Sequence, residues 1–115
     1  MTSPKDGADV DPVYVRAVLD AYRNCPATAG HVRASDRRLA QQLSRRRVPL
    51  DTVAAAFLLA TVRRLARPAD KPALGKVRSL AYFAPVIDEL IAEPPAPAYL
   101  EYLAARAARL APASH

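Results

Sequence analysis

Val53-Ala54-Ala55-Ala56-Phe57-Leu58-Leu59-Ala60 is the longest apolar run in this sequence of 115 residues, and it decides the fold. Asp51 stands just before it as a candidate N-cap, so the stretch predicts a helix over residues 52–67. A helix that is apolar on every side is stable only when other elements surround it. The sequence therefore predicts an all-α protein built around this helix.

Four shorter segments repeat apolar residues at helical spacing and are expected to pack around the central helix. They span residues 12–24, 36–47, 80–92 and 98–110. Asp11, Ser35 and Ser79 are the expected N-caps, and Pro85 lies near the start of the fourth helix of the chain. In the last helix the inward side chains are expected to be Tyr99, Leu100, Leu103, Ala107 and Leu110.

The expected architecture is a compact bundle of about five short helices. Residues 1–10 are polar and lack periodicity, which predicts a disordered arm. Residues 11–110 are expected to form a single helical domain, and residues 111–115 a frayed tail.

The basic residues are concentrated in the middle of the chain. The net charge is +6, with 14 arginines and 3 lysines. Residues 1–30 carry a net charge of −1 and residues 79–115 a net charge of −2. Residues 31–78 carry a net charge of +9, because they contain twelve basic residues and only three acidic ones, Asp36, Asp51 and Asp70. A codon bias toward arginine raises the total but does not explain this placement. The pattern predicts a polyanionic partner.

The twelve central cations are the candidate nucleic-acid-binding residues. They are Arg33, Arg37, Arg38, Arg45, Arg46, Arg47, Arg63, Arg64, Arg67, Lys71, Lys76 and Arg78. The planar fork of a guanidinium group matches phosphate oxygens. Phosphate contacts position a protein on its target without reading sequence, so poor sequence selectivity is expected. Tyr82 or Phe83 could stack on an unpaired base, although packing in the core is the favoured interpretation.

A helix-turn-helix over residues 36–56 is the sharper alternative. Apolar residues occur at suitable spacing, but Ser44 replaces the usual glycine of the turn and Pro49 stands where the second helix should begin. That second helix would present Ala54, Ala55 and Ala56, which cannot hydrogen-bond to base edges. A helical hairpin with arginines on its first arm fits the residues better.

No residue pattern indicates catalysis, and the sequence predicts a protein that is not an enzyme and takes no metal or cofactor. The two histidines are His31, in a loop, and His115, at the end of the chain. Cys25 is the only cysteine and is interpreted as a buried structural thiol. No apolar run is long enough for a membrane span, and no secretory signal is recognised, so a cytoplasmic protein without membrane contact is expected.

One family resemblance rests on residues 49–57 and 77–90. The second stretch, Val77-Arg78-Ser79-Leu80-Ala81-Tyr82-Phe83-Ala84-Pro85-Val86-Ile87-Asp88-Glu89-Leu90, resembles the C-terminal helical domain of DnaD-type replication-initiation and primosomal proteins of phages and plasmids. Tyr82, Val86, Ile87 and Leu90 take the places of an aromatic, two aliphatics and a tryptophan in that family's helix, so Leu90 is a departure. The resemblance implies DNA binding in replication or mobile-element biology.

The leading hypothesis is a small accessory protein that grips DNA phosphates in a replication or recombination system. The alternatives are an RNA-binding helical subunit of a ribonucleoprotein complex and a helical adaptor whose basic face docks on an acidic protein. A larger protein partner is expected, and the sequence leaves the oligomeric state open.

Overall fold

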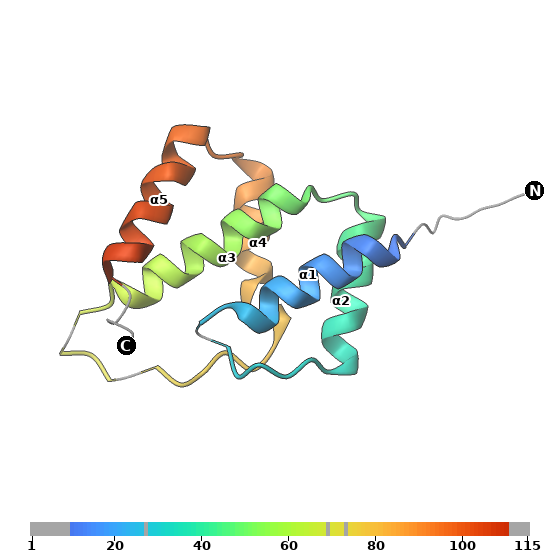
Figure 1. Ribbon diagram of the computed structural model, residues 1–115, viewed down its shortest axis with the longest axis horizontal. Helices are drawn as coiled ribbons and strands as arrows, with labels where there is room; N and C mark the ends of the chain where they lie inside the picture. Colours follow the sequence, from blue (N-terminus) through green and yellow to red (C-terminus); the bar gives the residue numbers. More distant parts are fainter. Residues whose placement is uncertain (1–9, 27, 69, 73, 111–115) are drawn as a thin grey trace, which may run out of the picture.

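The computed structural model describes residues 10–26, 28–68, 70–72 and 74–110, and within them it is all-helical (Figure 1). The elements are α1 (Pro12–Asn24), α2 (Ala34–Arg45), α3 (Leu50–Leu65), the 3₁₀ helix η1 (Leu80–Phe83), α4 (Ala84–Ala92) and α5 (Pro97–Leu110). The expectation of a bundle of about five short helices is confirmed. Residues 1–9 and 111–115, which carry most of the expected arm and all of the expected tail, lie outside the described residues.

α3 is the centre of the bundle, as its composition predicts. It crosses the middle of the molecule in Figure 1 and packs against α1, α4, α5 and η1. Seven of its residues are buried, including Val53, Ala56 and Phe57. No described helix is both long and apolar enough to cross a membrane.

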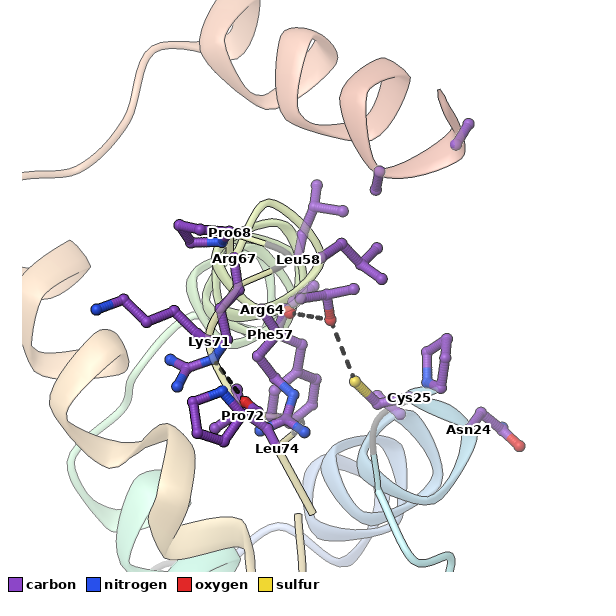
Figure 2. A pocket seen from close by; sticks show the side chains of 17 residues that line it. Asn24, Cys25, Phe57, Leu58, Arg64, Arg67, Pro68, Lys71, Pro72 and Leu74 are labelled. Atoms are coloured by element: carbon purple, nitrogen blue, oxygen red, sulfur yellow. Dashed lines mark hydrogen bonds between the residues drawn. The ribbon is translucent and has the colours of Figure 1, made fainter. Parts of the chain in front are cut away.

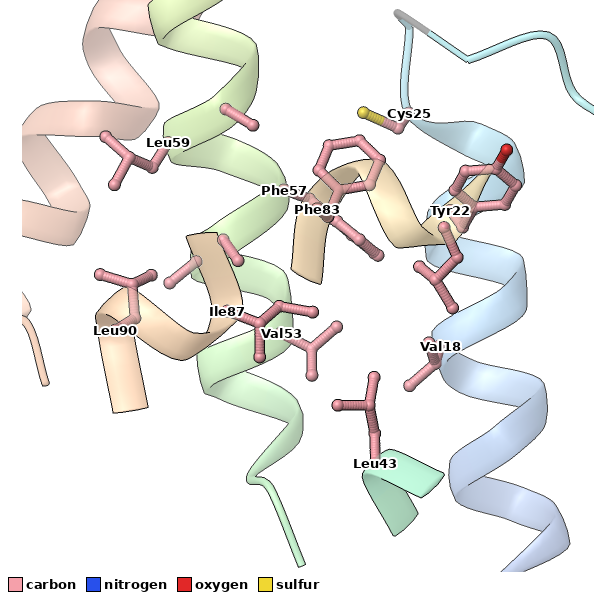
Figure 3. Packing of buried hydrophobic residues seen from close by; sticks show 14 of the residues in the cluster. Val18, Tyr22, Cys25, Leu43, Val53, Phe57, Leu59, Phe83, Ile87 and Leu90 are labelled. Atoms are coloured by element: carbon pink, nitrogen blue, oxygen red, sulfur yellow. The ribbon is translucent and has the colours of Figure 1, made fainter. Parts of the chain in front are cut away.

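The densest part of the core is a cluster of aromatic rings contributed by three elements. Figure 3 shows Phe57 of α3, Phe83 of η1 and Tyr22 of α1 facing one another. The ring centroids of Phe57 and Phe83 are 4.7 Å apart, and those of Tyr22 and Phe83 are 6.2 Å apart, both in edge-to-face geometry. Such pairs stabilise a core beyond the area they bury. Phe83 therefore packs in the core, which was the favoured interpretation from sequence.

The start of α2 differs from the expected one, because its N-cap is Arg33 and not Ser35. Asp36, at the third helical position, accepts a hydrogen bond from the backbone N–H of Arg33 at 2.8 Å. The side chain of Asp36, in the first turn, thus stabilises the N-terminus of α2, a role that was expected of Ser35 from the sequence. The helix ends at Arg45, two residues earlier than expected, and Arg47 has a positive φ of 58°.

The observed starts of the third and fourth helices also differ from the expected ones. α3 begins at Leu50 with Pro49 as N-cap, so Asp51 lies in the first turn rather than at the cap. The expected helix over residues 80–92 is divided into η1 and α4, with Pro85 in the first turn of α4. Proline has no N–H to donate and is tolerated only in the first turn of an α-helix, so the continuous helix begins there.

Asp36 also connects α2 to the segment before α4. Its second carboxylate oxygen accepts a hydrogen bond from the buried backbone N–H of Leu80 at 2.9 Å. Nearby, the N–H of Ala29 donates to the carbonyl of Val77 at 2.8 Å, and Thr28 and Val77 form an isolated parallel bridge. These contacts fix the end of the long connection between α3 and η1 against the α1–α2 connection.

α5 buries less of its surface than the sequence predicts. Leu103 is its one described residue that is fully buried, while Leu100, Ala107 and Leu110 are partly buried against the core. Tyr99 was expected to face inward but is 43% exposed and stacks on Tyr102 with a centroid separation of 6.0 Å. The two rings shield each other at the surface and leave the core contact to the aliphatic residues.

Candidate nucleic-acid interface

The twelve candidate cations fall into two groups on different parts of the fold. Six belong to α2 and its flanking residues, and six belong to the end of α3 and the connection from α3 to η1. In Figure 1, α2 lies at one end of the molecule and the end of α3 points toward the other. The side chains are exposed, apart from the partly buried Arg64. The structure therefore separates the cations of α2 from those at the end of α3, whereas Lys76 and Arg78, at the end of the connection, lie near the start of α2.

The outward face of α2 is an exposed cationic surface. The opposite face buries Asp36, Ala40, Leu43 and Ser44. Arg38 and Arg45 are seven residues apart, which places them two turns apart on the same side, separated by about 10 Å along the helix axis. Arg37, Arg38, Arg45 and Arg47 make no side-chain hydrogen bond or ion pair with any described residue. These side chains can contact phosphates without breaking an existing interaction.

Two other arginines are already paired with carboxylates of α4. Arg46 Nη2 lies 3.3 Å from Asp88 Oδ1, and Arg63 binds both carboxylate oxygens of Glu89 at 3.0 and 2.7 Å. The hydrogen bonds from Arg63 lower the pKa of Glu89 and raise the pKa of Arg63 itself. Asp88 and Glu89 are both exposed. Their charges offset part of the positive charge of Arg46 and Arg63.

Arg64 and Arg67 hold the connection that follows α3. Arg64 donates to the hydroxyl of Tyr82 at 3.2 Å and to the carbonyl of Gly75 at 2.6 Å, and its guanidinium lies 5.5 Å from the centre of the Tyr82 ring. Arg67 Nε donates to the carbonyl of Pro72 at 3.3 Å. Tyr82 is 44% exposed and is covered in part by Arg64. These two arginines have structural contacts that a phosphate would have to replace.

The last three cations of the central set occupy the connection itself. Lys71 is exposed and makes no side-chain interaction with a described residue. Lys76 and Arg78 flank the buried Val77, so they lie on the segment that runs beside residues 28–36, where Arg33 is found. Arg33, Lys76 and Arg78 therefore extend the basic surface around the N-terminus of α2.

Arg16 and Arg23 of α1 are two basic residues that sequence reasoning missed. They line a groove of about 510 Å³ between α1 and α2, together with Arg37, Gln41 and Asp20. Arg23 forms an ion pair with Asp20. The seven-residue spacing of Arg16 and Arg23 predicts that they share one helical face. They were missed because residues 1–30 carry a net negative charge, so this part of the chain was not considered basic. The basic surface of α2 therefore continues onto α1.

α3 is not placed to read bases as a recognition helix. Ala55, Ala56 and Phe57 are buried, and neighbours cover the helix on several sides. A helix that enters the major groove must expose polar side chains to base edges. The structure therefore disfavours the helix-turn-helix interpretation of residues 36–56.

Cys25 is 8% exposed, in keeping with the expected structural thiol, and its Sγ lies 3.4 Å from Thr61 Oγ1. Among the described residues no three histidine, cysteine or carboxylate side chains gather in a way that could hold a metal ion. His31 is exposed, and His115 lies outside the described residues.

Comparison of the chain with protein-family models, curated proteins and solved structures gives no match. The resemblance of residues 77–90 to the DnaD family therefore stays a prediction. In the structure Ile87 and Leu90 of that stretch are core residues, Val86 is partly buried, and Tyr82 is at the surface.

Proposed function

We propose that this protein is a small nucleic-acid-binding accessory protein that holds phosphates through the outward face of α2 and the adjoining face of α1. The observation that carries the proposal is a set of α2 arginines that form no ion pair with a described residue: Arg38 and Arg45 lie on one side of the helix, and Arg37 lies toward α1. Arginine forks bind phosphate oxygens through charge-assisted hydrogen bonds, and helix spacing presents them at a fixed interval.

The proposed binding is tolerant of sequence. The candidate contacts are long, exposed side chains, and the helix that would have to read bases is in the core. Phosphate and sugar contacts set position and orientation but carry no base information. We therefore expect similar affinity for unrelated sequences of the same nucleic-acid type.

The resemblance to DnaD proteins favours DNA over RNA and a role in replication or mobile-element recombination. In such a system the protein would act within a nucleoprotein complex beside a larger protein partner. An RNA-binding subunit would use the same arginines, so the nucleic-acid type is an outcome of the experiment below.

The test is a fluorescence-anisotropy titration with random-sequence duplex DNA, single-stranded DNA and RNA at two salt concentrations. The double substitution Arg38→Ala/Arg45→Ala removes two phosphate contacts, so the slope of log K against log salt on duplex should become shallower by roughly two. Affinity should fall by a similar factor for every sequence. The unfolding midpoint should hardly change, because exposed arginines contribute little to stability.

The matched control is Arg106→Ala/Arg109→Ala on α5, which removes the same charge from another helix. It should weaken binding less, since it alters only the long-range field, which salt screens. An equal loss in the two variants would show that net charge rather than the α2 face is responsible. A wild-type protein whose binding does not depend on salt, or that binds none of the three probes, would rule out the proposal and favour the adaptor alternative.

A further inference from the structure

A cleft of about 920 Å³ on the α3–α5 side of the molecule is unrelated to the α2 face. Its walls are the end of α1, one side of α3, the end of α5 and the first part of the connection after α3 (Figure 2). Sites for small molecules occupy roughly 300–1,000 Å³, so this volume is suited to such a ligand.

The interior of the cleft is apolar. Phe57 and Leu58 of α3 line it, together with alanines of α3 and α5. Apart from the cations, the polar side chains that line it are those of Thr61, Cys25 and Asn24; Thr61 Oγ1 donates to the carbonyl of Phe57 at 2.7 Å, and Cys25 Sγ contacts the same Thr61 oxygen. A polar ligand would therefore find few partners here, whereas an apolar one gains by leaving water.

The cationic side chains lie on one wall only. Arg64, Arg67 and Lys71 line the side formed by the end of α3 and the following connection, as Figure 2 shows. The described residues of α1 and α5 that line the cleft are uncharged. Arg64 is held in place by Tyr82 and Gly75, and Arg67 uses only its Nε in the contact with Pro72. The charge distribution is thus polarised across the cleft.

We infer that this cleft binds an amphiphile in which an apolar chain or ring system carries one anionic group. The apolar body would lie over Phe57 and Leu58, and the anion would face Arg67 and Lys71. A nucleic-acid strand does not fit this description, because its charges repeat along its length and its bases carry polar edges.

The experiment uses 8-anilinonaphthalene-1-sulfonate, an aromatic sulfonate of this class, as a fluorescent probe for the intact protein. The chain has no tryptophan, so intrinsic indole emission does not interfere. The probe should gain emission on binding, and dodecanoate should displace it at lower concentrations than dodecan-1-ol, its uncharged analogue. Arg67→Ala/Lys71→Ala should weaken dodecanoate binding about fivefold, as expected for two exposed charge contacts, and leave dodecan-1-ol nearly unchanged.

Two filling variants test the location. Ala54→Phe and Ala108→Phe each place a large side chain at the cleft from opposite walls, and each should weaken both ligands at least tenfold. Circular dichroism verifies that each variant folds. If Ala54→Phe does not fold, Ala108→Phe still tests whether the ligand binds in the cleft. Arg38→Ala/Arg45→Ala should bind amphiphiles like the wild type, which separates this inference from the proposed function. Equal displacement by dodecanoate and dodecan-1-ol, or undiminished binding by a folded filled variant, would overturn the inference.

Discussion

Replacement of Asp36 by alanine should destabilise the protein more than any other single loss of charge. Asp36 is 1% exposed, and its two carboxylate oxygens accept backbone hydrogen bonds from Arg33 and Leu80 at 2.8 and 2.9 Å. Loss of an acceptor at a helix N-terminus costs about 1 kcal/mol. An unpaired buried N–H, here that of Leu80, costs roughly 2 kcal/mol. The expected total is about 3 kcal/mol.

The assay is urea unfolding monitored by circular dichroism. With an m-value of about 2 kcal/mol/M, a loss of this size lowers the midpoint by roughly 1.5 M. Asp36→Asn keeps one carbonyl acceptor and should lose less. The matched control is Asp51→Ala, because Asp51 is exposed and makes no side-chain hydrogen bond with a described residue; its effect should be about 0.5 kcal/mol. A loss below about 1 kcal/mol for Asp36→Ala would refute the reasoning.

Two titration predictions concern other groups. Arg63 lowers the pKa of Glu89, so the stabilisation is present above the pKa of the unfolded chain and lost as the pH falls through the lower, folded pKa. Glu89→Gln should therefore reduce the unfolding midpoint at neutral pH and leave it unchanged in strong acid; an equal loss at both would contradict the pairing. Burial raises the pKa of Tyr14 and Tyr22, so in an alkaline absorbance titration both phenols should ionise at a higher pH than tyrosine does in an unfolded chain. The buried hydroxyl of Tyr22 has no described hydrogen-bond partner, so Tyr22→Phe should keep or raise stability by about 1 kcal/mol, measured by urea unfolding; a loss above 1 kcal/mol would reveal an overlooked contact.

The helices themselves could be predicted from the sequence, whereas several of their ends could not. Apolar spacing and an uninterrupted apolar run are local properties, and they identified every α-helix and the central position of α3. The N-terminus of α2 depended on a long-range contact: Asp36 caps Arg33 and at the same time binds Leu80, 44 residues away. Ser35 was the better local candidate, but its side chain makes no hydrogen bond with a described residue.

The sequence predicted which residues make up the candidate interface, but not which of its arginines are free of ion pairs with described residues. The excess of arginine in residues 31–78 correctly identified α2 as a cationic element. Whether an arginine is paired depends on the folded arrangement, and Arg46 meets Asp88 across 42 residues of sequence. The groove between α1 and α2 brings Arg16 beside Arg37, which a count of charges along the chain does not show.

The attachment of α5 has a consequence for local opening. This helix packs chiefly against α3, and the connection that precedes it contains two prolines, Pro94 and Pro95. A helix held chiefly by one neighbour opens at a lower free energy than the whole fold, so the amide hydrogens of α5 should exchange with solvent before those of α3. Ala107 and Ala108 of α5 form one wall of the apolar cleft. Release of α5 would therefore dismantle the cleft while α1 to α4 stay folded, and a bound amphiphile would slow exchange selectively in the last helix.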